Sequence, residues 1–238
     1  MSQRFFSIII PAHNEELIIE QTLRHLAEID YPKDRYEVII VENGSTDATY
    51  EYARRHESET IKVHQAPRKG VSHARNFGKT KCYPFHDWCI FMDADVSVKK
   101  EFLTELNTYL EAHPHVGYGT TTVQLDSDTL AAKVWSRLNA FTFRLFKFLF
   151  TIHIVRKDLS AKVTYNEELT SGEDTLYGRE LARHGTYFFM PTKSVTTSAR
   201  RFEKKGYLKM FFINASRGAA CVVLPHKILK KLDWEVVR

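Results

Sequence analysis

The sequence is poor in cysteine, and its cysteines follow no familiar pattern. They are Cys82, Cys89 and Cys221, an odd number without a Cys-x-x-Cys pair. Disulfide-rich secreted domains and zinc ribbons both need paired cysteines at short spacing, so neither class is indicated. A reducing compartment fits this usage best, and we expect a cytoplasmic protein.

Long uncharged apolar runs are also missing. The longest apolar stretch, residues 138–155, carries Arg144 and Lys147, whereas a membrane-spanning helix needs roughly 20 apolar residues. The shorter run at 5–10 is followed by Pro11 and then by acidic residues, without a small-residue cleavage site. It therefore reads as a buried strand, and we expect a chain that does not cross a membrane.

Repeats, low-complexity segments and linkers are absent too, and the remaining composition is that of an ordinary globular protein. Of 238 residues, 43% are hydrophobic and 26% charged, which allows one large domain with a sizeable core. The 34 basic and 29 acidic side chains give a net charge of +5, which favours acidic partners such as nucleotides or lipid headgroups. No nucleic-acid-binding signature accompanies that charge, so we expect no nucleic-acid partner.

Strands and helices alternate along the first half of the chain. The patterns predict strands at 5–10, 36–41, 61–64 and 88–93, and helices that begin near 14, 47, 71 and 99. This alternation is typical of an open α/β sheet, whose ligands bind at the carboxyl ends of the strands. Polar residues follow three strands, at 11–14, 42–47 and 93–95. We expect these to line one crevice.

The pattern changes after residue 125. A long amphipathic stretch (129–150) precedes a helix at 173–184, a strand at 186–190 and a basic tail. Because no linker separates the halves, we expect a single domain over residues 1–238.

Two carboxylates one residue apart follow the fourth strand, in Asp93-Ala94-Asp95. Such a pair at a strand end can hold a hard divalent cation against phosphate oxygens. The alternative is that Asp95 completes a turn or caps the next helix.

Two loops carry further candidates for anion or base recognition. Glu42 follows the second strand and can accept a base N–H, whereas Asp47 can equally be a helix cap. In the basic segment 66–78, Lys69 and Arg75 can reach a diphosphate, although a solvated basic loop is the alternative. A third pair, Glu173-Asp174, sits at a predicted helix start, where a carboxylate can act as general base or merely close a capping box.

Together these segments resemble the family-2 glycosyltransferases, which have the GT-A fold. The resemblance rests on SIIIPAHNEE (7–16), VIIVENGSTDAT (38–49), GVSHARNFG (70–78), FMDADV (91–96) and GEDTLYGREL (172–181). It implies a single Rossmann-like open mixed sheet flanked by helices, with a nucleotide-sugar-binding half (1–125) and an acceptor-binding half with a basic helical tail (126–238). It also implies transfer of a sugar from a nucleotide diphosphate with inversion at the anomeric carbon.

The resemblance assigns roles residue by residue. It places nucleotide-sugar contacts on Pro11, Ala12, Glu15, Glu42, Arg75 and Asp93, to which we add Lys69 of the basic segment and Ala94 between the two aspartates. It places Mn²⁺ or Mg²⁺ on Asp95 with Asp93, and it assigns catalysis to Asp174 as general base, with Glu173 beside it. The metal then stabilises the departing diphosphate.

Two departures from the family pattern matter. Many relatives have Asp-Asp where this chain has Glu42-Asn43, which leaves the base open, with uridine preferred as the commonest in the family. Many also have a metal-side His where this chain reads SVTTSARRFEKKG (194–206). We expect Arg200 and Arg201 to bind the diphosphate instead; a solvated basic loop is the alternative.

The stretch 138–155 combines aromatic and basic side chains. It can lie on a membrane and meet a lipid-linked acceptor, or it can be core or a subunit interface of a homo-oligomer.

The leading hypothesis is a metal-dependent inverting hexosyltransferase that uses a nucleotide-diphosphate sugar and a glycan or lipid-linked acceptor in polysaccharide assembly, in the cytoplasm and at the inner membrane face. One alternative is a polyprenyl-phosphate glycosyltransferase, whose phosphate acceptor needs no base. Another is a non-catalytic nucleotide-sugar-binding subunit.

Overall fold

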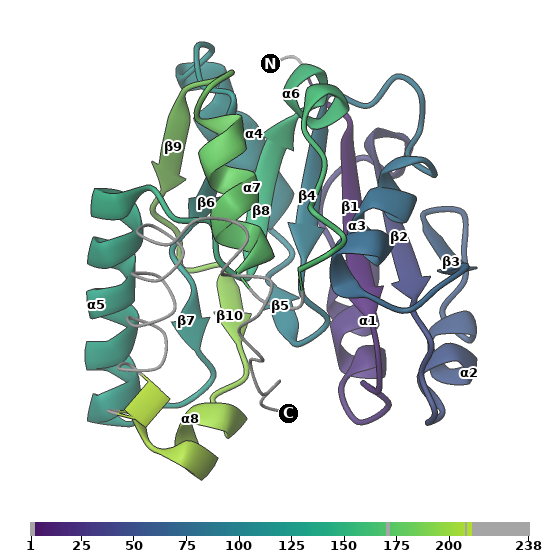
Figure 1. Ribbon diagram of the computed structural model, residues 1–238, viewed down its shortest axis with the longest axis horizontal. Coiled ribbons are helices and arrows are strands. Elements are labelled where there is room, and N and C mark those ends of the chain that lie inside the picture. The colour runs from purple at the N-terminus through teal and green to yellow at the C-terminus, as the bar shows by residue number, and fades with distance from the viewer. Residues whose placement is uncertain (1–2, 170–171, 208, 211–238) are drawn as a thin grey trace.

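A seven-stranded mixed sheet forms the centre of the protein (Figure 1). The computed structural model describes residues 3–169, 172–207 and 209–210. In spatial order the strands are β3 (Ile61–Gln65), β2 (Tyr36–Glu42), β1 (Phe6–Ala12), β4 (Trp88–Met92), β8 (Ile152–Arg156), β6 (Tyr118–Thr121) and β9 (Tyr187–Met190). The first four run parallel, and β8 is antiparallel to both β4 and β6. The predicted open α/β sheet is confirmed.

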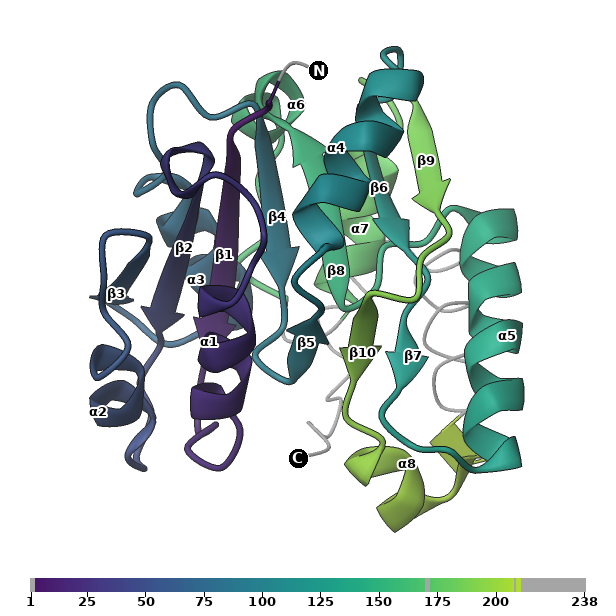
Figure 2. The ribbon, with the colours of Figure 1, turned by 180° about the vertical axis from the view of Figure 1, so that it is seen from behind.

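Helices cover both faces of this sheet, which explains why the strands are apolar on both parities. Helices α1 (Ile19–Ala27) and α4 (Phe102–Ala112) pack on one face, and α3 (Val71–Lys79) and α7 (Glu173–Leu181) on the other (Figures 1 and 2). In β1, Ile8 and Ile10 join the first core and Ile9 joins the second. The shorter α2 (Thr49–Arg54) adds Ala53 to the first core, and α6 (Lys157–Lys162) adds Leu159 to the second. A 3-10 helix, Lys33–Arg35, directly precedes β2.

Helix α3 approaches the sheet unusually closely, because Gly78 faces β1. A Cβ atom at Gly78 would lie 2.5 Å from Cγ2 of Ile9. Only a residue without a side chain fits there. This contact fixes the height of α3, and therefore of Arg75, above the strand ends.

A second, three-stranded sheet extends beyond the carboxyl ends of the central strands. It consists of β5 (Val96–Val98), β10 (Val195–Thr197) and β7 (Gln124–Leu125). Strand β5 packs on α1, and β7 packs on α5 (Leu130–Phe146). Helix α8 (Arg200–Lys205) follows β10 (Figure 2). Residues of both halves of the chain thus share each sheet.

One local prediction was wrong. The helix expected from Asn14 begins only at Ile19, because Asn14 adopts a positive φ of 55° and the backbone N–H groups of residues 14–16 bond to side chains of the next loop. The stretch 138–155 divides between two elements, because α5 ends at Phe146 and β8 follows in the central sheet. Ile152 and Ile154 of β8 are fully buried, so the core alternative is confirmed for this second part.

Within the described part of the chain, no helix combines the length and the hydrophobicity that crossing a bilayer requires.

Candidate active site

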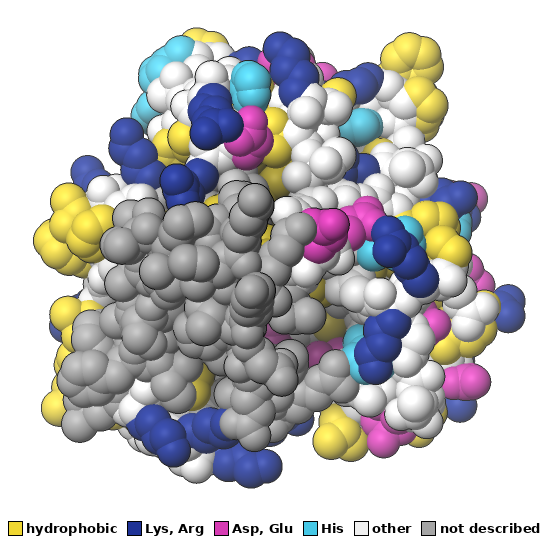
Figure 3. All heavy atoms as spheres, viewed as in Figure 1, with side chains coloured by type: hydrophobic (Ala, Val, Ile, Leu, Met, Phe, Trp, Pro, Cys, Tyr) yellow, Lys and Arg dark blue, Asp and Glu magenta, His cyan; other side chains and the backbone are white. Residues whose placement is uncertain are grey.

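Three strand ends meet at one edge of the central sheet, as the sequence predicts. Strands β1, β2 and β4 are neighbours and parallel, with Ala12 paired to Glu42 and Ile9 to Phe91. Their arrowheads point to the same edge in Figure 1. The segments 13–16, 43–47 and 93–95 that follow them therefore lie around a common crevice, and Figure 3 shows acidic side chains in a hollow on this face.

The first two segments are tied together by hydrogen bonds. Oγ of Ser45 accepts from the Asn14 N–H (3.1 Å), and Oγ1 of Thr49 accepts from the Glu15 N–H (2.7 Å). Asp47 accepts from the Thr49 N–H (3.0 Å). Burial would raise the pKa of Asp47, but the hydrogen bonds that its carboxylate accepts from the hydroxyl and the N–H of Thr49 and from the Glu16 N–H outweigh burial and lower that pKa. Asp47 thus serves the start of α2, which was the alternative to a ligand role.

Pro11 and Ala12 are buried within β1, whose end Asn43 secures. The Asn43 side chain donates to the Ala12 carbonyl (3.3 Å) and accepts from the Gly70 N–H (2.9 Å). The backbone carbonyl of Glu15 receives the N–H groups of residues 18 and 19 and so starts α1. These residues shape the crevice mainly through their backbone.

Glu42 is buried at the end of β2, with 5% of its surface exposed. Its Oε1 accepts from the Ser45 N–H at 2.5 Å, and its Oε2 lies 3.5 Å from Nε2 of Gln65. Lys69 is exposed and passes over the same turn, since a Cβ at Gly44 would lie 3.6 Å from Cβ of Lys69. Glu42 and Lys69 therefore sit on the same side of the crevice.

Arg75 is the centre of the charged cluster. It projects from α3, its side chain is 3% exposed, and its Nη2 donates to Oδ1 of Asp93 at 2.8 Å. Its Nη1 donates to Oδ1 of Asp174 (2.6 Å) and to Oε1 of Glu173 (3.2 Å). One guanidinium therefore joins the end of β4 to the start of α7. These two segments carry separate sequence motifs, at 91–96 and 172–181.

The electrostatics of this cluster follow from its burial. Burial alone would lower the pKa of Arg75, but Asp174 and Asp93 outweigh it and raise that pKa well above its ordinary value. Burial, together with the Asp174 carboxylate, raises the pKa of Glu173 to about 7. Glu173 is thus a buried carboxyl that titrates near neutrality, beside a more exposed Asp174.

His153 belongs to this site, and sequence reasoning missed it. It lies on β8, 1% exposed, with Nδ1 2.7 Å from Oη of Tyr165 and Nε2 3.6 Å from Oδ1 of Asp174. Burial and the Arg75 cation lower the pKa of His153 to about 3, so the ring is neutral and forms no ion pair. Tyr165 stacks on Tyr177 of α7, with ring centroids 3.8 Å apart. The strand sequence Ile-His-Ile-Val predicts that His153 is buried, but it does not predict that His153 lies beside Asp174.

The two aspartates after β4 are held by their backbone. The Asp93 N–H donates to the Thr151 carbonyl (3.1 Å), and the Asp95 carbonyl accepts from the Ser198 N–H (3.3 Å). Between them, the buried Ala94 accepts at its carbonyl from Oγ1 of Thr22 on α1 (2.7 Å). The Asp93 side chain is 37% exposed. Carboxylate oxygens at an open edge suit a hard divalent cation, so the donor set fits Mn²⁺ or Mg²⁺.

Helix α8 lies near this pair through the small sheet. Thr197 pairs with Val96 directly after Asp95, and Arg200 follows three residues later with its side chain exposed. The Arg201 side chain lies outside the described residues. So does Ser171, the residue with which Asp174 would form the capping box that was the alternative to a base role. The helix start is instead formed by Gly172 with φ 76°.

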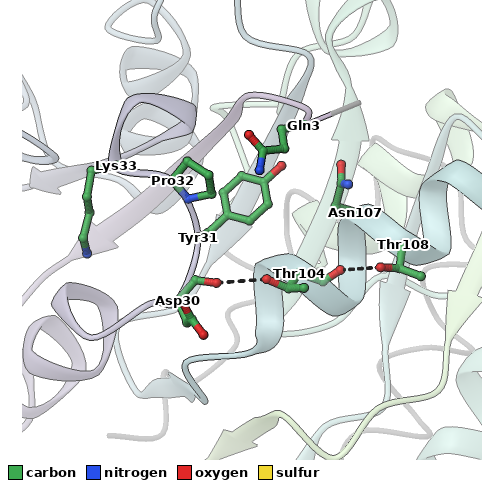
Figure 4. A pocket seen from close by; sticks show the side chains of 8 residues that line it. All are labelled: Gln3, Asp30, Tyr31, Pro32, Lys33, Thr104, Asn107 and Thr108. Atoms are coloured by element: carbon green, nitrogen blue, oxygen red, sulfur yellow. Dashed lines mark hydrogen bonds between the residues drawn. The ribbon is translucent and has the colours of Figure 1, made fainter. Parts of the chain in front are cut away.

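A separate hollow lies between the α1–β2 connection and α4 (Figure 4). Its volume is about 750 Å³, and its lining includes Asp30, Tyr31 and Asn107. Thr104 bonds the Asp30 carbonyl there at 2.9 Å. None of the predicted site residues lines it, so it is separate from the charged cluster.

Comparison with known proteins places this geometry in a family. The sequence model described as Glycosyl transferase family 2 matches residues 7–170. The probable glycosyltransferase YdaM of Bacillus subtilis is 40% identical over 78 residues, which cover 30% of this chain and 19% of YdaM. The poly(ribitol-phosphate) beta-N-acetylglucosaminyltransferase TarS of Staphylococcus aureus is 30% identical over 111 residues, covering 45% of this chain and 19% of TarS. The matches span about a fifth of either relative.

Solved structures share the fold. The crystal structure of S. aureus TarS 1-349 in complex with UDP-GlcNAc has a TM-score of 0.67 at 22% identity, over 82% of this chain and 58% of that chain. The mannosyltransferase PcManGT from Pyrobaculum calidifontis, in complex with GDP-Man and Mn²⁺, has a TM-score of 0.64 at 20% identity, over 91% and 65%. These matches confirm a fold of the GT-A type.

Proposed function

The chain belongs to glycosyl transferase family 2, and from this membership we propose that it transfers a sugar from a nucleotide-diphosphate donor to a hydroxyl of a glycan or lipid-linked acceptor. The observation that carries the proposal is the placement of Arg75, which holds Asp93 and Asp174 on one guanidinium. A donor-side carboxylate and a candidate base thereby face the same crevice. The proposed unit is one domain over residues 1–238, with donor contacts before residue 125 and acceptor contacts after it.

The donor is proposed to lie over the ends of β1, β2 and β4. Pro11, Ala12 and Glu15 would border the base and ribose, and Glu42, together with the exposed Lys69, would contact the base or phosphates. TarS was crystallised with UDP-GlcNAc and PcManGT with GDP-Man, which supports a nucleoside diphosphate sugar. We prefer uridine as the base.

A divalent cation, Mn²⁺ or Mg²⁺, would be held by Asp95 with Asp93. PcManGT was crystallised with Mn²⁺, and the Asp93 carboxylate is open to solvent on one side, which supports this assignment. When bound, such an ion neutralises negative charge that develops on the departing diphosphate.

Asp174 is proposed as the general base of an inverting displacement. As the acceptor oxygen forms its bond to the anomeric carbon, the bond from that carbon to the diphosphate oxygen breaks, and the acceptor's proton passes to Asp174. Arg75 fixes the orientation of the Asp174 carboxylate through Oδ1. Glu173, whose pKa is raised to about 7 by burial, accepts a second hydrogen bond from the same Nη1 of Arg75.

Two further contacts complete the proposal. Arg200 and Arg201 would bind the diphosphate through their planar guanidinium groups, which the position of α8 beside Asp95 supports. Helix α5 would lie on an anionic membrane surface at the cytoplasmic face and bring the site to a lipid-linked acceptor. Its exposed Leu138, Phe141 and Leu145 alternate with basic side chains, and Figure 3 shows apolar side chains along the edge where α5 lies.

Calorimetric titration of UDP, GDP, dTDP and CMP, each with and without Mn²⁺, tests the donor site. We expect manganese-dependent binding of one diphosphate, preferably UDP, in the wild type and its loss in Asp95→Ala. A Glu105→Ala variant is the control, because Glu105 bonds Thr192 and Ser194 and does not border the crevice. Absence of binding by every nucleotide would overturn the proposed transferase.

A further inference from the structure

Three side chains with metal-binding atoms gather at the end of β4 opposite the candidate active site. Cys82 follows α3, His86 lies in the α3–β4 connection, and Cys89 is the second residue of β4. Asp93 follows the other end of this strand, four residues from Cys89, which corresponds to about 13 Å along the strand. The cluster is therefore independent of the charged cluster around Arg75.

The geometry of the three side chains suits a small tetrahedral metal ion. The Sγ atoms of Cys82 and Cys89 and a ring nitrogen of His86 all lie within 4.8 Å of one another. Nε2 of His86 is 3.3 Å from Sγ of Cys89. With metal–ligand distances of about 2.3 Å to sulfur and 2.05 Å to nitrogen, tetrahedral zinc separates S from N by about 3.5 Å and S from S by about 3.8 Å. The side chains need only small rotations to reach this arrangement.

The orientation of His86 is fixed in the way that metal-binding histidines require. Its Nδ1 lies 2.6 Å from the Tyr83 carbonyl oxygen. A carbonyl only accepts, so Nδ1 carries the proton and donates it, and in the neutral ring Nε2 keeps its lone pair. That lone pair is directed towards Cys89. Histidine ligands generally donate their second nitrogen to such an outer partner, which holds the ring and its tautomer.

The loop that carries His86 is also anchored. The His86 N–H donates to the Tyr83 carbonyl (3.0 Å), and Lys157 of α6 donates to the Pro84 carbonyl. Asp87 holds the following turn by accepting from the Phe5 N–H at 2.7 Å. Hydrogen bonds thus hold the backbone on both sides of His86, so the position of its side chain relative to the two cysteines is fixed by the fold.

We propose that Cys82, His86 and Cys89 form a binding site for Zn²⁺, with water as the fourth ligand. Thiolate and imidazole ligands select zinc over Mg²⁺ or Mn²⁺, which prefer oxygen. Each binding event releases the two thiol protons to solvent. Two thiolates then balance the 2+ charge, so the neutral centre tolerates the burial of Cys89, which is 1% exposed. Cys82 is only partly buried and leaves a path for the ion and the water.

The site has a structural consequence. Cys82 comes three residues after the end of α3, and Cys89 lies inside the central sheet. A bound ion would fasten the carboxyl end of α3 to β4. Because a metal that binds only the folded chain stabilises it, zinc should raise the thermal unfolding midpoint.

The test is zinc uptake by the fully reduced chain of residues 1–238, measured by competition with a chromophoric chelator. We expect about one equivalent bound by the wild type, and a loss of affinity of at least about 100-fold in Cys82→Ser and in His86→Gln. Co²⁺ in place of zinc should give thiolate-to-metal charge-transfer absorption that both variants lack. Circular dichroism establishes that each variant is folded; Cys82 and His86 are chosen because neither is fully buried.

His113→Gln is the matched control. Nδ1 of His113 also meets a backbone carbonyl, that of Tyr109 at 2.8 Å, but His113 is no member of the cluster. It should bind zinc as the wild type does, and so should Cys221→Ser, whose cysteine lies outside the described residues. No uptake by the folded, reduced wild type overturns the proposal. Undiminished uptake in His86→Gln, or loss in Cys221→Ser, does so as well. A Cys82–Cys89 disulfide that persists under mild reduction, without zinc uptake, would assign the pair to redox chemistry instead.

Discussion

Nη1 of Arg75 donates a hydrogen bond of 2.6 Å to Oδ1 of Asp174, across 99 residues of sequence. The arginine side chain is 3% exposed and the aspartate side chain 24% exposed. A charge buried this deeply is stable only with partners of opposite charge. Removing either the guanidinium or its carboxylates would therefore leave unpaired charges and destabilise the cluster. The orientation of Asp174, the proposed base, therefore depends on Arg75 of α3 as much as on its own helix α7.

Arg75→Met should destabilise the protein by about 3 kcal/mol, because it leaves the carboxylates of Asp93, Glu173 and Asp174 without their shared cation. Urea unfolding at pH 7 measures this. Arg68→Met is the matched control: Arg68 pairs with Glu167 at the surface, where its side chain is 63% exposed, so the change should cost less than about 1 kcal/mol. Equal midpoints for the two variants would show that the buried pairing contributes nothing.

Glu173 should make stability depend on pH. Its pKa is raised by burial to about 7 in the folded protein, whereas an unfolded glutamate titrates near about 4.3. Between these values the folded state binds more protons than the unfolded state, so this group's contribution to stability falls as pH rises. Glu173→Gln removes the titration and keeps an oxygen for Arg75.

The measurement is the unfolding free energy of wild type and Glu173→Gln at pH 5 and pH 8. The variant should gain stability relative to the wild type as pH rises between these values. Glu180→Gln on the exposed side of the same helix, where Glu180 pairs with Arg183, should track the wild type. Parallel curves for Glu173→Gln and wild type would contradict the raised pKa.

Asp174→Asn separates a hydroxyl acceptor from a phosphate acceptor. The amide keeps an oxygen for Arg75 but cannot take a proton, so transfer should fall by about 10²–10⁴-fold while donor binding is retained. Turnover of a nucleotide sugar and calorimetry on the same preparation provide the two readouts. Transfer at the wild-type rate would favour the polyprenyl-phosphate alternative, whose acceptor needs no base.

The sequence predicts the sheet well where one signal dominates. The run at 36–41 and the helix at 71–79 match β2 and α3 closely, because burial on two faces and glycine at the helix start leave few alternatives. Strand β8 was missed because its apolar residues continue directly from those of α5; only Lys147, in the left-handed conformation, marks the helix end. The short strand β6 was missed because Tyr118–Thr121 is too brief for a period to be recognised.

The candidate site could be predicted from the sequence only in part, because its contacts join residues that are far apart in the chain. The sequence predicts that Asp93, Asp95 and Asp174 carry chemistry, because they follow a strand or stand at a helix start. The joint attachment of Asp93 and Asp174 to Arg75 depends on contacts across 18 and 99 residues, and no local pattern encodes these. His153 was hidden for a similar reason, since only its neighbours in space make it part of the site.

Arg200→Ala combined with Arg201→Ala should weaken donor binding by about tenfold or more, which equals about 1.4 kcal/mol, through the loss of guanidinium contacts to the diphosphate. Lys204→Ala with Lys205→Ala removes the same charge from the end of the same helix and should have a smaller effect. Calorimetry with the preferred nucleotide compares the pairs. If the double arginine variant binds the nucleotide as tightly as the wild type, Arg200 and Arg201 are solvated side chains that do not contact the diphosphate.

Helix α5 provides the last prediction, because its outer face is apolar and faces solvent. Phe141 and Leu145 are 67% and 59% exposed, and the exposed Arg137 and Arg144 flank them. Wild type should co-sediment with vesicles that contain anionic lipid, and Phe141→Ser with Leu145→Ser should not, while keeping the thermal midpoint. Leu17→Ser is the control, since Leu17 is 80% exposed before α1. If the wild type instead does not co-sediment with the vesicles, and analytical ultracentrifugation shows a dimer that these substitutions dissociate, the outer face of α5 is a subunit interface. The acceptor then need not be a membrane lipid.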